Sequence, residues 1–162
     1  MDLLFKFIKS GRLLRITIFL FISVWYLGLS TPIILSSNGL YVLTPLIKKI
    51  YSNVCHQETY KCIFLGGQHF LVCSRCLGIY TGMLIFSGLS IFLGLKPKYI
   101  KRLLVFSLTF ILIDILLYNI GLYKYSQYIA FVTGLFFGSV TFIYILNEFE
   151  NYLLTITPFH EK

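Results

Sequence analysis

All four cysteines of the chain lie within 22 consecutive positions, together with two of its three histidines. In chain order, the cluster consists of Cys55, His56, Cys62, His69, Cys73 and Cys76. Thiolates and imidazoles are the usual ligands of tetrahedral zinc, and two cysteines spaced Cys-x-x-Cys can share one ion on a tight turn. We therefore predict a zinc-like metal site formed by Cys55, His56, Cys73 and Cys76. Cys62 and His69 are second choices for this site.

Two other chemistries fit the same residues. Structural disulfides are natural in a loop outside the cell, where the environment is oxidising. A redox-active pair also uses the Cys-x-x-Cys spacing, and Arg75 between Cys73 and Cys76 would favour the thiolate. In that alternative the chain is an enzyme, a thiol–disulfide oxidoreductase that passes electrons to a quinone. The residues leave open which of the three chemistries applies.

Asp114 is an acidic residue within a long apolar run. At the centre of a membrane-spanning helix such a residue costs about 2.5–3.5 kcal/mol, so it is expected to face the helix bundle. One interpretation makes Asp114 a proton or small-cation site and the candidate catalytic residue. The other makes it a neutral acid that is hydrogen-bonded to Ser, Thr or Tyr. No basic residue is expected at comparable depth, so an ion pair is not predicted.

The elements that position these residues follow from the composition, which is 57% hydrophobic and 12% charged. The mean hydropathy is +0.83, whereas a soluble domain carries about 25% charged residues. Four runs reach the roughly 20 apolar residues that a membrane crossing needs. The predicted spans are residues 16–35, 77–95, 103–122 and 128–146, the last closed by Asn147 and Glu148. We predict an all-α membrane protein with four transmembrane helices, in one domain over residues 1–162.

The loop 36–76 between the first two spans is predicted to form a small extracytoplasmic cap. Its first part, Leu40–Asn53, is read as an amphipathic helix at the membrane interface. Its second part contains the pair Gly66-Gly67 between β-prone runs, which is typical of a two-residue hairpin turn.

In the hairpin register that this turn sets, Leu65 faces Gln68 and Tyr60 faces Cys73. The returning strand would bring the Cys-x-x-Cys pair back to Cys55 at the outer end of the second span. Residues that are distant in sequence would therefore converge on one site.

The net charge of +8 is spread in a way that excludes nucleic acid as a partner. The basic residues stand at the ends of the apolar runs, where they set topology and contact anionic headgroups. With the N-terminus inside, nine Lys and Arg residues fall on the inner side and five on the outer side. We predict a plasma-membrane protein with both termini cytoplasmic, and the lipid bilayer as its partner. No protein partner is identified, and a homo-oligomer is compatible with the sequence.

Two spans carry glycines four residues apart, Gly78 with Gly82 and Gly134 with Gly138. Such small-xxx-small pairs let helix backbones approach closely in a membrane. We predict that both pairs serve helix packing.

The stretch from Cys55-His56-Gln57 through Cys73-Ser74-Arg75-Cys76 to Gly82 resembles a known family. This is a bacterial family of small multi-span membrane proteins with the signature Cys-His-Gln … Cys-x-Arg-Cys-x-Gly-x-Tyr-x-Gly. The resemblance is specific over residues 55–82 and extends weakly over about residues 50–140. It implies that Cys55, His56, Cys73 and Cys76 form the functional set, and it implies no particular reaction.

Overall fold

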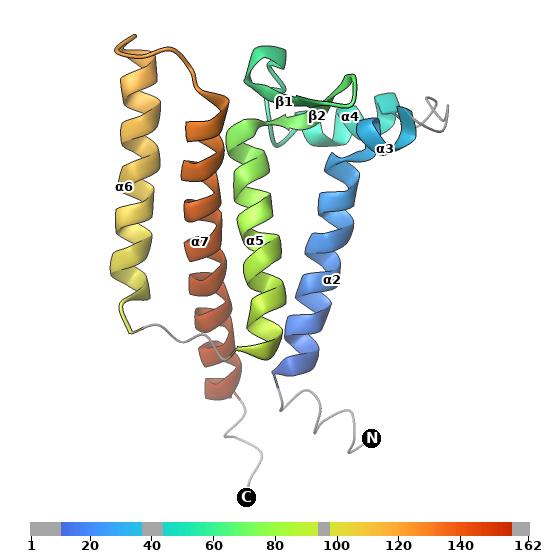
Figure 1. The fold of residues 1–162 in the computed structure, drawn as a ribbon. Coiled ribbons are helices and arrows are strands. Elements are labelled where there is room, and N and C mark those ends of the chain that lie inside the picture. Colours follow the sequence, from blue (N-terminus) through green and yellow to red (C-terminus); the bar gives the residue numbers. More distant parts are fainter. Residues whose placement is uncertain (1–10, 37–43, 94–97, 157–162) are drawn as a thin grey trace, which may run out of the picture.

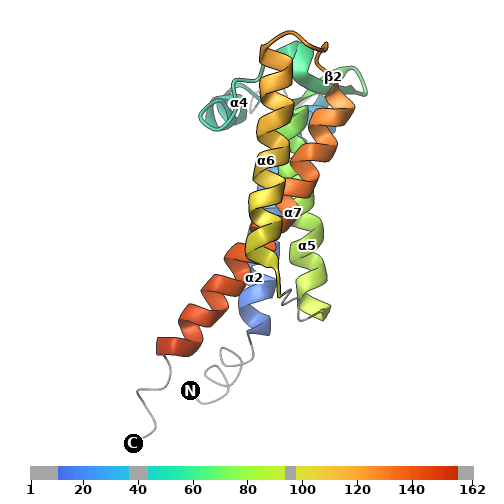
Figure 2. The same ribbon diagram turned by 90° about the vertical axis from the view of Figure 1, so that its left-hand side faces the viewer.

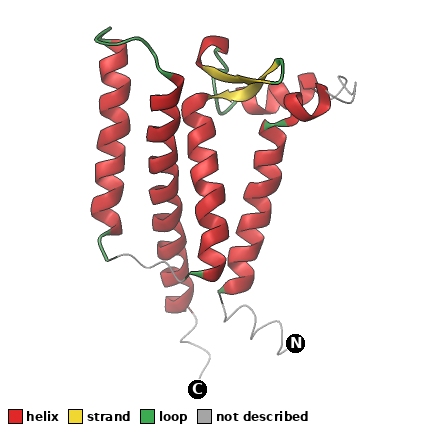
Figure 3. Ribbon diagram, viewed as in Figure 1, coloured by secondary structure: helices red, strands yellow, loops and turns green. Residues whose placement is uncertain are grey.

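The computed structural model of this chain describes residues 11–36, 44–93 and 98–156. Four long helices lie side by side, and a small cap lies at one end of them (Figure 1). The long helices are α2 (Arg12–Leu29), α5 (Ser74–Phe92), α6 (Ile100–Asn119) and α7 (Gln127–Ile156). The cap consists of α3 (Thr31–Ser36), α4 (Thr44–Ser52), η2 (Thr59–Lys61), β1 (Cys62–Leu65) and β2 (Gln68–Cys73). The predicted helical class is confirmed, with one small two-stranded sheet (Figure 3).

Three of these helices have the length and apolar composition to cross a membrane. They are α2, α5 and α7 as far as Tyr152, whereas α6 is not among them. Its 20 residues include two basic residues and one acidic residue: Lys101, Arg102 and Asp114. Three of the predicted spans therefore correspond to candidate membrane helices, and a fourth span stays a prediction.

The first helix ends earlier than its predicted span of residues 16–35, because α2 stops at Leu29 and α3 follows. The cause is Pro32, which has no N–H to donate and whose ring crowds the carbonyl four residues earlier. That carbonyl belongs to Gly28, and Thr31 Oγ1 donates to it at 2.6 Å. The break directs the chain from the membrane segment into the cap.

α6 ends at Asn119 rather than at residue 122 as predicted. Gly121 has a φ of 79°, a left-handed conformation that only glycine adopts without strain. Its N–H donates to the carbonyl of Tyr118, and the N–H of Leu122 donates to that of Leu117. This paired arrangement is a common way to end a helix.

The last helix is longer than predicted, since α7 continues to Ile156 rather than closing at residue 146. Figure 2 shows its lower part diverging from α5. Here Glu150 receives two hydrogen bonds from Arg15 of α2, at 2.7 and 3.0 Å. Arg15 also donates to the carbonyl of Ser90 at 2.5 Å, so it joins α2, α5 and α7. Residues 94 and 95 of the second predicted span lie outside the described residues.

α5 and α7 run in the same direction and touch backbone to backbone. A Cβ on Gly78 or Gly82 of α5 would overlap backbone carbonyls of α7. A Cβ on Gly134 or Gly138 of α7 would likewise overlap carbonyls of α5. The predicted packing role of both glycine pairs is confirmed. α6 packs on the other side of α7, and α2 packs on α5 (Figure 1).

The cap hairpin turns at Gly66 and Gly67, whose φ angles are 58° and 82°. Two consecutive left-handed residues match the turn that twists with an antiparallel pair. Leu65 pairs with Gln68, as predicted. The prediction that Tyr60 faces Cys73 is wrong, because an irregularity between Cys62 and Phe64 shifts the register and puts Cys62 opposite Cys73.

α4 confirms the predicted cap helix over Thr44–Ser52, and its predicted start at residues 40–43 lies outside the described residues. Lys48 and Lys49 are exposed, whereas Tyr51 is buried. Tyr51 donates its hydroxyl to the carbonyl of Trp25 at 2.7 Å, and the two ring centroids are 4.8 Å apart. This contact holds α4 against the upper part of α2.

Candidate metal centre

Three cysteine sulfurs meet where the cap joins α5. The Sγ atoms of Cys55, Cys73 and Cys76 all lie within 4.8 Å of one another. Cys55 follows α4, Cys73 ends β2, and Cys76 lies in the first turn of α5. Cys55 is buried and the other two are half-buried, and all are free thiols. Around a tetrahedral zinc ion with bonds of about 2.3 Å, sulfurs stand about 3.8 Å apart, so the spacing suits one shared ion.

The surroundings of Cys55 favour its thiolate. The thiols of Cys73 and then Cys76 donate hydrogen bonds to its sulfur and lower the pKa of Cys55, and the backbone amides of Cys73 and Gln57 add to this. The amide of Cys73 lies 3.3 Å from the sulfur. The pKa of Cys73 is raised in turn, because its thiol donates to Cys55. The Cys55 thiolate is therefore stabilised by the thiol protons of Cys73 and Cys76. A metal ion could displace these protons and bind all three sulfurs.

The start of α5 also favours negative charge at the site. Cys73 is the residue that caps this helix, and Cys76 is its third residue. The amides at the start of a helix carry partial positive charge, which stabilises thiolates within the first turn. In the metal-free protein the thiols of Cys73 and Cys76 keep their protons, so the helix start would offset the charge of these two sulfurs once a metal displaces those protons.

The other predicted ligands lie apart from these three sulfurs. His56 follows Cys55, but its side chain is exposed and does not belong to the group. His69 is exposed in the hairpin, and its ring lies 4.9 Å from that of Phe64. Cys62 is fully buried and donates to the carbonyl of Glu58 at 3.3 Å. Burial raises the pKa of Cys62 to about 11, so it remains a thiol.

Gln57 holds the turn that presents Cys55, a role that its sequence position did not reveal. Its φ is 53°, in the left-handed region that residues other than glycine seldom occupy. Its side-chain amide donates to the carbonyl of Lys48 at 3.1 Å and so ties the turn to α4. A strained backbone residue beside a cluster of reactive groups is typical of functional sites.

Contacts with α7 and α5 hold the other side of the hairpin. The side-chain amide of Gln127 donates to the carbonyls of Tyr60 and Cys62, at 3.1 and 3.0 Å. Ser74, the first residue of α5, donates its hydroxyl to the carbonyl of Lys61 at 2.7 Å. The hairpin that delivers Cys73 is therefore fixed to two helices.

Lys61 adds a cationic contact to the upper end of α6. Its ammonium lies 5.1, 5.3 and 5.9 Å from the ring centroids of Tyr60, Tyr118 and Tyr125. It also forms an ion pair with Glu58 at 2.5 Å, which raises the pKa of Lys61. Three rings around one ammonium form an aromatic cage, in which the cation is held by the ring faces.

Asp114 is buried and forms an ion pair with Arg75. The prediction that no basic residue lies at its depth is wrong. α6 ends at Asn119, so Asp114 lies only five residues, about 7.5 Å, from the cap end, within reach of an arginine. Its Oδ2 accepts from Arg75 and its Oδ1 from Tyr123. Both carboxylate oxygens are therefore engaged within the protein, which does not favour Asp114 as a cation-transport site.

A family model and a curated protein match the part of the chain that contains the site. The profile described as "Predicted membrane protein (DUF2085)" matches residues 55–144, which include the three clustered cysteines. The "Uncharacterized protein MJ1492" of Methanocaldococcus jannaschii is 31% identical over 124 residues, covering 70% of this chain and 75% of that protein. This relative is archaeal, so the similarity is not confined to bacteria. No solved structure matches.

Proposed function

The chain belongs to the DUF2085 family of predicted membrane proteins, and on that premise we propose that Cys55, Cys73 and Cys76 bind one zinc ion in a cap at the outer membrane surface. The observation that carries the proposal is the spacing of the three sulfurs, within 4.8 Å of one another. Thiolate ligands of this number and spacing suit zinc better than the hard cations, which prefer oxygen.

The fourth position of a tetrahedral site is assigned to His56. It directly follows Cys55 in the sequence and its side chain is exposed, so binding would require the ring to turn toward the sulfurs. If the position is instead filled by solvent, the site would have the open coordination that is typical of catalytic zinc. Replacement of His56 by Ala should weaken metal binding if His56 is the fourth ligand. It should leave metal binding unchanged if solvent fills that position.

The proposed role of the ion is to join the cap to the membrane helices. Cys55 belongs to the segment that leaves α4, whereas Cys73 and Cys76 belong to the junction of β2 and α5. The hairpin has strands of only four and six residues, and it shares its core with the helices, because Leu71 and Val72 of β2 are buried with Leu29 and Tyr51. A shared ion would add a second connection between the cap and α5.

We further propose that α6 crosses the membrane as a fourth span. α5 and α7 both start at the cap end and run in the same direction. If both cross the bilayer, the chain between them must return through it. α6 is the described element that runs back, and it is 20 residues long. Its ion pair with α5 neutralises Asp114, its acidic residue.

Cobalt substitution tests the ligand set directly. Protein purified without metal and loaded with Co²⁺ should show the intense visible bands of tetrahedral coordination and the near-ultraviolet charge-transfer band of cobalt–thiolate bonds. The Cys62→Ser variant is the matched control and should keep the spectrum, because Cys62 stands apart from the group. A spectrum of six-coordinate cobalt, or one that is unchanged in Cys73→Ser, would reject the site.

A second candidate function is that of a quinone-linked thiol–disulfide oxidoreductase, which the placement of Cys73 and Cys76 at the start of α5 favours. In that reaction the two thiols would form a disulfide and release two electrons and two protons, which a quinone accepts to become the hydroquinone. Metal-free protein with a Cys73–Cys76 disulfide that reforms upon addition of a quinone would support it. Tightly bound zinc that blocks this oxidation would reject it.

A further inference from the structure

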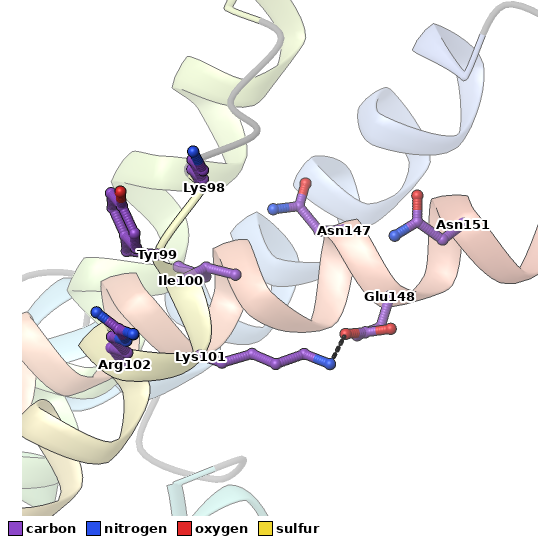
Figure 4. Close-up of a pocket in the computed structure, with 8 residues that line it drawn as sticks. All are labelled: Lys98, Tyr99, Ile100, Lys101, Arg102, Asn147, Glu148 and Asn151. Carbon is purple, nitrogen blue, oxygen red and sulfur yellow. Dashed lines mark ion pairs between the residues drawn. The ribbon is translucent and has the colours of Figure 1, made fainter.

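A basic pocket lies at the end of the helices opposite to the cap. It has a volume of about 620 Å³ and opens between the start of α6 and the later part of α7 (Figure 4). Three cations line it, namely Lys98, Lys101 and Arg102. All three are exposed.

The two sides of the pocket offer different groups. On the α6 side, Lys98 Nζ and the Arg102 guanidinium lie 5.7 and 5.6 Å from the centroid of the Tyr99 ring. On the α7 side, the amide of Asn147 lines the pocket (Figure 4). Cations and amide donors therefore line one hollow, a combination that suits an anion with several acceptor oxygens.

One carboxylate opposes this charge. Glu148 lies in the pocket and pairs with Lys101 at 3.5 Å, across the hollow (Figure 4). With Lys101 offset in this way, Lys98 and Arg102 remain without a carboxylate partner among the described residues. The pocket keeps two uncompensated positive charges.

We propose that this pocket binds a phosphate-bearing anion, supplied by the headgroup of an anionic phospholipid. The pocket lies at the end of the apolar segment of α7, which is long enough to span a bilayer, and this end is the level of the headgroups. Each Lys or Arg near an anionic membrane surface contributes about 1 kcal/mol, which is about fivefold in affinity. Tyr99 is exposed beside the pocket, as is typical of aromatic residues at the interface. The site is independent of the proposed metal centre.

Native mass spectrometry of the detergent-purified full chain tests the proposal, with phosphatidylglycerol and phosphatidylcholine as the probes. Wild-type protein should retain phosphatidylglycerol in preference to phosphatidylcholine. The Lys98→Ala/Arg102→Ala double variant should bind phosphatidylglycerol about fivefold more weakly for each cation removed. The matched control is Lys48→Ala/Lys49→Ala, which removes the same number of exposed cations from the cap and should weaken the binding less. An equal loss in the control would show that lipid binding follows net charge and would overturn a site in this pocket.

Glu148→Gln should change the retention of phosphatidylglycerol in the opposite direction. This variant tests the pocket even if the double variant fails to fold. It removes the opposing carboxylate and releases Lys101, so retention of phosphatidylglycerol should increase. Equal binding of the two lipids, or a double variant that binds as wild type, would overturn the proposal. If inorganic phosphate displaces the lipid at equal concentration, the anion is not supplied by a lipid headgroup. The pocket is then a site for a soluble anion.

Discussion

Arg75, which stands between Cys73 and Cys76, forms an ion pair with Asp114 of α6, 39 positions further along the chain. α7 lies between α5 and α6 (Figure 1), and this ion pair connects the two outer helices of the three. The carbonyl of Arg75 is also the atom that a Cβ on Gly134 of α7 would overlap. The segment that carries two clustered sulfurs therefore also fixes the positions of α6 and α7.

Removal of either partner of this ion pair should destabilise the protein by about 3–5 kcal/mol, because the other charge is left buried without compensation. We expect this for Arg75→Met and for Asp114→Leu, measured as unfolding in detergent. The double variant should recover most of the loss, since it removes both charges. Additive losses in the double variant would show that the two residues act independently.

The close contact of α5 and α7 predicts a strong effect at Gly138. Gly138→Ala places a methyl group against the backbone carbonyl of Ile79, and such overpacking costs about 1–3 kcal/mol. Gly88→Ala is the control, because a Cβ there meets only the ring of Phe19, at 3.3 Å. Thermal unfolding should rank Gly138→Ala below Gly88→Ala, and the reverse order would contradict the packing described above.

The cage around Lys61 predicts a difference between two substitutions. Lys61→Met keeps the aliphatic length but removes the cation, so it should lose about 1 kcal/mol of stability. Lys61→Arg should stay close to wild type, because guanidinium also binds ring faces and can pair with Glu58. Chemical unfolding of the two variants in the same detergent provides the measurement. A Met variant as stable as the Arg variant would show that the cage contributes nothing.

Much of the architecture follows from local patterns. The apolar runs locate the long helices, and Gly66-Gly67 predicts the hairpin and its first pair, Leu65 with Gln68. The glycine pairs predict a close helix contact, although they do not say which helices form it. These features depend on residues near one another in sequence, so the sequence is enough to find them.

The rest depends on contacts between distant segments. The length of α7 reflects the pairing of Glu150 with Arg15, 135 positions away. The partner of Asp114 depends on where α6 ends. Gly121 sets that end, but the apolar residues continue past it and so do not mark it. In the site, clustering in sequence identified Cys55, Cys73 and Cys76, but the irregularity that puts Cys62 opposite Cys73 leaves no sequence signal.

Reporter fusions test the four-span proposal and its orientation. With the nine-to-five distribution of basic residues, a fusion after Asn53 should report from outside and one after Lys98 from inside. A fusion after Tyr123 should again report from outside, because α6 returns the chain. If the Tyr123 and Lys98 fusions report from the same side, α6 does not cross and the proposal fails.

Metal analysis of the purified, unreduced protein tests the proposed zinc site. We expect about one equivalent of zinc per chain, released below about pH 6, where protons compete for the ligands. Cys55→Ser, Cys73→Ser and Cys76→Ser should each lose the metal, whereas Cys62→Ser should keep it. Thiol counting should find the three clustered cysteines protected from alkylation until a chelator is added. Protein without metal whose Cys73 and Cys76 are joined as a disulfide would show that these cysteines do not bind zinc.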